Sequence, residues 1–148
     1  MSNRIKFKNF EDVLKALEKM ELSPFTLKGD WDAYQHLMHC SQSLQLNITG
    51  YPLEKSHLFQ QTIGHAVFFL FKTSGALSHN TNAFTEGTKP IPKNGFQQGI
   101  QQYRNQIIRF LDWNGPLNAH AFFGKLSKQN VIRYHSMHFA NHFEQFQF

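Results

Sequence analysis

Apolar side chains recur along most of the chain at intervals of three and four residues, which is the spacing that gathers them on one face of an α-helix. The pattern predicts five helices: one that begins after Asn9, and others over about residues 31–48, 55–73, 96–113 and 127 to the end. No segment alternates convincingly between apolar and polar residues as a half-buried strand does. The hydrophobic pattern therefore predicts an all-α protein.

Residues that favour helix ends flank these segments. Asn9, Asp30 and Ser127 can each cap the first turn of the helix that follows, because their side-chain oxygens can accept hydrogen bonds from free backbone N–H groups. Gly75 can end the third helix in a left-handed conformation. The side chains from Phe68 to Phe71 are all apolar, so we expect this third helix to be buried.

A long polar connection, Ser78–Gly95, separates the third and fourth predicted helices and contains Pro90 and Pro92. Connections of this length are uncommon in compact domains and often serve as lids or crossovers. Four long helices, an additional short helix and one long crossover connection predict a four-helix bundle, formed by a single domain over residues 1–148. Such bundles build metal sites from side chains on facing helices.

Composition narrows the functional classes. The chain has 16 Phe among 148 residues, a net charge of +5 and a single cysteine, which excludes an internal disulfide framework. The longest apolar run, Ala66–Phe71, is far too short to span a membrane, and the first twenty residues lack the apolar core of a signal peptide. Arg4, Lys6 and Lys8 form the one local basic cluster and the other basic residues are scattered. Because no recognition motif or concentrated basic stripe accompanies the net charge, nucleic-acid binding is disfavoured. We expect a cytoplasmic protein without membrane partners.

The last predicted helix carries the most informative chemistry. His138 and His142 are four residues apart, so their rings can point toward one metal ion, and His135 lies on the same line. This line is also the apolar stripe of the helix, where an imidazole needs a partner. The spacing is compatible with two metal ligands and equally with two histidines at the core edge that bond to neighbouring side chains.

A third ligand would have to come from another helix. His36 and His39 lie on the second predicted helix, and His65 lies on the third. A helical projection places His36 beside the main apolar stripe and His39 on the opposite side, but a central helix can bury both sides. The residues alone leave this choice open.

Other polar residues near the histidines have smaller predicted roles. Asn141, Gln145 and His135 can orient a ligand ring through hydrogen bonds. Three further histidines fall in predicted loops or at helix ends, and we assign them no role. They are His57, His79 and His120.

Several short fragments, spread along the chain, together resemble the pattern of a known protein superfamily. They are Gly29-Asp-Trp-Asp-Ala-Tyr-Gln-His-Leu-Met-His-Cys-Ser-Gln-Ser43, Gly50-Tyr-Pro52, Pro90-Ile-Pro92, Phe122-Phe-Gly-Lys-Leu126 and His138-x-x-x-His142-x-x-Gln145. The set resembles the DinB/YfiT-like superfamily, and is most similar to a bacterial branch of it known only as a domain of unknown function. The resemblance extends over nearly the whole chain from about residue 7.

The resemblance implies a four-helix bundle of DinB/YfiT type with a divalent metal ion, most often zinc or nickel, held by three histidines. On the matching positions these are His39, His138 and His142. It also implies a metal-dependent transferase that uses a low-molecular-weight thiol. Because a metal ion can activate a bound water as well as a thiol, a hydrolase is the other enzyme class we expect. Asn141 departs from the pattern of relatives, which often carry a second histidine there.

The Phe-rich composition supports an alternative function. A metal-free helical module could hold an apolar small molecule or mediate homodimerisation, and the shortage of acid–base groups favours this alternative. The sequence thus predicts two functional classes, a three-histidine metalloenzyme and an apolar binding module.

Overall fold

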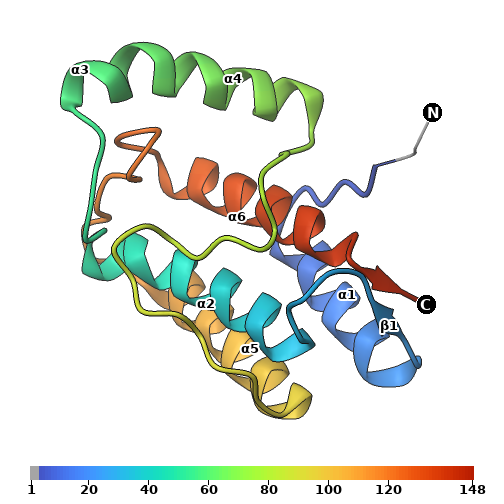
Figure 1. The fold of residues 1–148 in the computed structure, drawn as a ribbon. Coiled ribbons are helices and arrows are strands. Elements are labelled where there is room, and N and C mark those ends of the chain that lie inside the picture. Colours follow the sequence, from blue (N-terminus) through green and yellow to red (C-terminus); the bar gives the residue numbers. More distant parts are fainter. Residues whose placement is uncertain (1–3) are drawn as a thin grey trace.

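A computed structural model describes residues 4–148, which are mostly helical. Four helices pack on one another: α2 lies against α5 and α6, and α1 lies against α6 and α5 (Figure 1). A second helical unit, which we call the outer arm (residues 57–74), lies on one side of these four helices. The four helices are α1 (Phe10–Leu22), α2 (Ala33–Thr49), α5 (Phe96–Asp112) and α6 (Lys128–Phe143). The arm comprises α3 (His57–Phe59), the π-helical segment η1 (Gln60–Gly64) and α4 (His65–Ser74).

Side-chain caps set the starts of the long helices. The predicted caps at Asn9 and Ser127 are confirmed, since each side chain accepts a hydrogen bond from a backbone N–H three residues later. The cap of α2 is Asp32 and not Asp30. Asp32 accepts from the backbone N of Gln35 at 2.8 Å, and the Gln35 side chain accepts from the backbone N of Asp32 at 3.0 Å. This reciprocal capping box satisfies two free donors, which a single cap cannot do.

The apolar faces of the four packed helices meet in one core. Aromatic rings make many of the contacts: Phe10 meets Phe110 edge to face at 6.0 Å, and Phe7 stacks on Phe139 at 6.0 Å. Such pairs add specific geometry to the burial of apolar area. Residues with no measurable exposure include Val13, Leu17, Leu37, Leu44, Tyr103, Ile107, Phe110, Met137 and Phe139. The core fixes α2 and α6 face to face.

A small sheet corrects two sequence-based expectations. β1 (Thr26–Leu27) pairs antiparallel with β2 (Phe146–Gln147), although the sequence indicated no strand. The last helix ends at Phe143 and does not continue through the following residues. Two-residue strands are too short to leave an alternating pattern in the sequence, so hydrophobic periodicity does not detect them.

The expected burial of the third predicted helix is wrong. Phe68 is buried, but Phe69 and Leu70 are 64% and 63% exposed. The arm contacts the rest of the molecule along one side, where the Phe68 ring lies 5.6 Å from the ring of Phe123. An apolar run indicates which residues favour burial, but it does not provide a partner for each of them.

The connection from α4 to α5 runs beside α2 (Figure 1). It begins at Gly75, whose left-handed φ of 73° confirms the predicted helix end. Further along, the Gln35 amide on α2 donates to the carbonyl of Ile91 at 2.9 Å, and the Asn94 backbone N donates to Asp32 at 3.1 Å. The connection therefore lies over the amino-terminal half of α2.

Among residues 4–148, no helix combines the length and the apolar character that a membrane crossing requires.

Candidate metal centre

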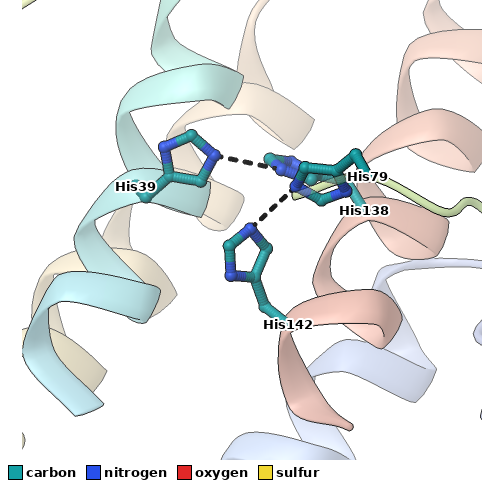
Figure 2. A group of neighbouring side chains, drawn as sticks. All are labelled: His39, His79, His138 and His142. Carbon is teal, nitrogen blue, oxygen red and sulfur yellow. Dashed lines mark hydrogen bonds between the residues drawn. The ribbon is translucent and has the colours of Figure 1, made fainter. Parts of the chain in front are cut away.

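Four histidines converge between α2, α6 and the α4–α5 connection. His39 comes from α2, His138 and His142 from α6, and His79 from the connection (Figure 2). The Nε2 atoms of His39 and His138 lie 3.2 Å apart, and those of His79 and His142 lie 3.1 Å apart. One nitrogen of each ring lies within 4.8 Å of the others. The cluster thus joins segments that are far apart in the sequence.

Helix geometry explains two of these positions. His138 and His142 are four residues apart on the inner face of α6, and their ring centroids lie 4.9 Å apart. His39 faces them from α2 because α6 packs directly against that helix. His79 follows α4 by a few residues and has no helical periodicity to reveal its position.

Burial keeps these imidazoles neutral. Burial lowers the pKa of His39 to about 3 and that of His79 to about 4. The neighbouring imidazoles lower the pKa of His39 further, and the Arg4 guanidinium lowers that of His79. The pKa values of His138 and His142 are well below 6.5 for the same reasons, burial first. At neutral pH each ring therefore keeps a lone pair on one nitrogen, which is the form that binds metals.

The donor set fits a divalent transition metal. Tetrahedral zinc with Zn–N bonds of 2.0–2.1 Å places its ligand nitrogens about 3.3 Å apart. The 3.2 Å separation between Nε2 of His39 and Nε2 of His138 is close to that value. Imidazole suits zinc, copper, iron and nickel, whereas calcium and magnesium prefer oxygen. Within the described residues 4–148 the group consists of histidines, so its chemistry favours a transition metal.

His36 lies behind this cluster. Its Nδ1 is 2.9 Å from the Nδ1 of His142, and the ring is completely buried. Burial lowers the pKa of His36 to about 4, and Asp32 opposes this shift only in part. Because its hydrogen bond is to the outer nitrogen of His142, His36 is placed to orient that ring and is not among the converging nitrogens.

Asn141 lies behind His79 in a similar way. Its amide nitrogen is 3.2 Å from His79 Nδ1, and its amide oxygen accepts a hydrogen bond from Arg4 at 2.8 Å. Arg4 also donates to the carbonyl of Leu77 at 2.8 Å and forms an ion pair with Glu144 at 3.4 Å. Arg4 thus ties the segment before α1 to α6 and to the start of the connection.

Aromatic rings cover one side of the cluster. The indole of Trp31 stacks on Phe84 at 4.5 Å and lies parallel to the ring of His142 at 6.0 Å. On another side a cavity of about 480 Å³ reaches the cluster. Its lining includes His39, Ser43, Tyr51, His79, Phe84, Glu86, His120, Phe122, Tyr134 and His138. A small molecule in this cavity would contact His39, His79 and His138 of the cluster directly.

The remaining predicted site residues lie elsewhere. His65 is exposed at the start of α4, and His135 pairs with Asn47 at 2.7 Å. Gln145 lies beside the β1–β2 pair, where its backbone carbonyl accepts a hydrogen bond from the N–H of Lys28 at 2.9 Å. Of the predicted ligands, His39, His138 and His142 come together, although their binding of a metal stays a prediction.

Sequence reasoning missed His79, which was assigned no role. The one available signal was its place at the start of the long connection Ser78–Gly95, whose length already indicated a functional segment. His120 was also passed over. It is buried in a loop, where its Nδ1 accepts hydrogen bonds from the backbone N–H groups of Phe122 and Phe123.

Comparison with known proteins assigns the family. The model of a family described as "Protein of unknown function (DUF1569)" matches residues 1–147. The chain belongs to the DUF1569 family. The resemblance to the DinB/YfiT-like superfamily is therefore wrong, because DUF1569 is a distinct family and no DinB/YfiT family matches. No curated protein and no solved structure matches the chain. For this DUF1569 protein, the choice of His39 over His36 now rests on geometry alone.

Proposed function

We propose that this DUF1569 protein is an enzyme that depends on a divalent transition metal, zinc or nickel, held by His39, His138 and His142. One observation carries the proposal: buried, neutral imidazoles from two facing helices point their nitrogens at one another. Aligned lone pairs in a buried site are unfavourable unless a proton or a cation lies between them. A metal ion satisfies all three nitrogens at once.

The residues around the cluster support a catalytic site. Three protein ligands leave a further coordination position open, which is typical of catalytic and not of structural zinc sites. When bound, such an ion lowers the pKa of a coordinated water or thiol and supplies a nucleophile at neutral pH. His36 orients His142, while Trp31 and Phe84 shield that side of the cluster from water.

The cavity restricts the substrate class. Its lining includes the Glu86 carboxylate and, among residues 4–148, no lysine or arginine. A phosphate or sulfate group would find no cationic partner there beyond the ion itself. Aromatic rings and the hydroxyls of Ser43, Tyr51 and Tyr134 favour an uncharged, partly apolar small molecule. The reaction that fits is hydrolysis of such a molecule, or its transfer to a low-molecular-weight thiol.

Elemental analysis tests the metal site. Protein purified without chelator is expected to hold about one equivalent of transition metal, and His39→Ala and His138→Ala are each expected to lose it. His65→Ala is the matched control, because His65 is exposed and outside the cluster. Absence of metal in the natural protein, even after zinc or nickel is added, would overturn the proposal. A metal-loaded sample would then be compared with a metal-free one in hydrolase and thiol-transfer assays.

A second candidate function is self-association through the outer arm. Leu58, Ile63, Phe69 and Leu70 are more than half exposed, and no Asp, Glu, Lys or Arg occurs from Ser56 to Phe71. Two copies with a net charge of +5 each could meet at this uncharged face with the least repulsion. Light scattering would then give a dimer mass that Phe69→Lys reduces to a monomer mass. A monomer mass for the natural protein excludes the dimer.

A further inference from the structure

The outer nitrogens of the four clustered histidines have different surroundings: those of His39 and His138 have no hydrogen-bond partner among residues 4–148, whereas those of His142 and His79 each face a side chain. An imidazole that binds a metal uses a lone pair on one nitrogen, and it commonly donates its other N–H to a nearby acceptor. His142 can follow this rule, because its outer nitrogen Nδ1 faces the Nδ1 of His36 at 2.9 Å. The outer nitrogen of His79 faces a donor instead, the side-chain NH2 of Asn141 at 3.2 Å.

Arg4 fixes the direction of that amide. A guanidinium group has only donors, so the atom of Asn141 that lies 2.8 Å from Arg4 has to be the oxygen. The NH2 group of Asn141 therefore faces His79. Since an amide NH2 donates, His79 Nδ1 must accept and carries a lone pair. A neutral imidazole has a single N–H, which in His79 is then on Nε2.

The same direction continues through the cluster. His79 Nε2–H points to the Nε2 of His142 at 3.1 Å, so that atom is an acceptor with a lone pair. The proton of His142 is then on Nδ1 and is donated to His36 Nδ1 at 2.9 Å. Arg4, Asn141, His79, His142 and His36 thus form one chain in which every hydrogen bond runs the same way. Nε2 of His142 is available to a metal, whereas Nε2 of His79 is not.

We infer that His79 is not a fourth metal ligand but a hydrogen-bond donor, which presents Nε2–H to the exogenous ligand that completes the coordination shell. This inference rests on the proposed metal site. Once the lone pair of His142 binds an ion, His79 loses its acceptor, and its N–H is free for the incoming molecule. His79 lies in a connection and lines the cavity, so it is accessible from the substrate side.

A donor at this place defines the class of ligand. An atom that binds the ion and also accepts from His79 needs a second lone pair, as in a carboxylate, a thiolate, a carbonyl oxygen or azide. An imidazole or amine nitrogen uses its only lone pair on the metal and gains nothing from His79. The site should therefore prefer azide-like ligands over amine-like ligands of similar size.

Nitrogen NMR reads the tautomer directly. In protein loaded with zinc and labelled with ¹⁵N at histidine, His79 is expected to show a protonated Nε2 and an unprotonated Nδ1, identified by loss of its signals in His79→Leu. A metal-bound, unprotonated Nε2 would overturn the inference while leaving the metal site intact. Absence of bound zinc would instead remove the proposed function, and the inference with it.

Ligand affinities give an independent test. In cobalt-loaded protein, His79→Leu is expected to weaken azide binding about 10-fold, equivalent to one hydrogen bond of about 1.4 kcal/mol, and to leave imidazole binding unchanged. Its zinc affinity should stay within about 3-fold of the natural protein, whereas loss of a true ligand costs far more. Equal loss for azide and imidazole, or a loss of zinc affinity like that of His138→Ala, would contradict the inference.

The variant Asn141→Asp is expected to reverse the tautomer of His79. A carboxylate of the same shape accepts from Nδ1–H, so it favours the opposite tautomer of His79 and frees the Nε2 lone pair for the ion. Zinc affinity should then rise about 10-fold and azide should no longer bind, because His79 takes its position. Unchanged zinc and azide affinities in this variant would show that Asn141 does not set the tautomer.

Discussion

His36 contacts the proposed metal centre through His142, with their Nδ1 atoms 2.9 Å apart. Replacing it with alanine leaves the Nδ1–H of His142 buried without an acceptor, which disfavours the ring orientation that metal binding needs. We predict that His36→Ala weakens zinc binding about 10- to 100-fold without abolishing it. Competition with a chromophoric chelator measures this change. An affinity equal to that of His65→Ala would contradict it.

Single residues differ in how far the sequence reveals them. His138 and His142 were found because a four-residue interval on a helix has a definite geometry. Helical projection favoured His36 over His39 because His36 flanks the apolar stripe, but α2 buries both of its sides and it is His39 that lies in the cluster. His79 was missed because a connection without periodicity does not indicate where its side chains point. Its place depends on Arg4 and Asn141, which are distant in sequence.

At the scale of elements, the outer arm depends on a close approach at Gly64. A Cβ atom there would lie 2.3 Å from the carbonyl oxygen of Phe122, which is far inside contact distance. We predict that Gly64→Ser destabilises the protein by about 1–3 kcal/mol, the usual cost of overpacking. Gly95→Ser is the matched control, because it meets nothing within 4 Å at the start of α5 and serine is a favourable cap. Urea unfolding measures both variants, and equal stabilities would show that the arm adjusts freely.

The sequence predicted the ranges of the helices along the chain better than it predicted which of them are buried. The ranges of α1, α2, α5 and α6 follow from periodicity and caps, and they agree with the structure to within a few residues, apart from the end of α6. The burial of α4 could not be predicted from Phe68–Phe71, because the four-helix core is already filled by other segments. β1 and β2 pair through backbone hydrogen bonds, which depend on proximity in space. Strands of two residues are too short to show a recognisable side-chain pattern in the sequence.

At the scale of the whole molecule, the buried histidines make stability depend on pH. Among residues 4–148, six histidines are buried, and burial lowers the pKa of each below 6.5: His36, His39, His120, His135, His138 and His142. The unfolded chain binds protons at these residues as the pH falls through about 6.5, while the folded chain does not until about pH 4 or lower. Protons are therefore bound preferentially by the unfolded state, and the free energy of unfolding decreases with acidification.

Each such histidine contributes a slope of up to about 1.4 kcal/mol per pH unit below its unfolded pKa. We predict that the metal-free protein is stable above about pH 7 and unfolds cooperatively near pH 5. Urea titrations followed by circular dichroism across this range measure the slope. Zinc should shift the transition to lower pH, because it binds the folded state and competes with protons. A stability that stays constant from neutral to acidic pH would contradict the burial of these rings.

Trp31 can serve as an intrinsic fluorescent reporter of the proposed metal centre. The chain has two tryptophans. In Trp113→Phe the remaining emission would come from Trp31, whose indole stacks on Phe84 and lies parallel to the ring of His142. A paramagnetic ion such as nickel should quench this fluorescence on binding, and a molecule that lifts Phe84 away should shift the emission to the red. Unchanged emission in a sample with bound nickel would place the ion elsewhere. The intensity of Trp31 emission would thus report occupancy of the centre, and its wavelength would report movement of the connection. Both could be followed in real time without any added dye.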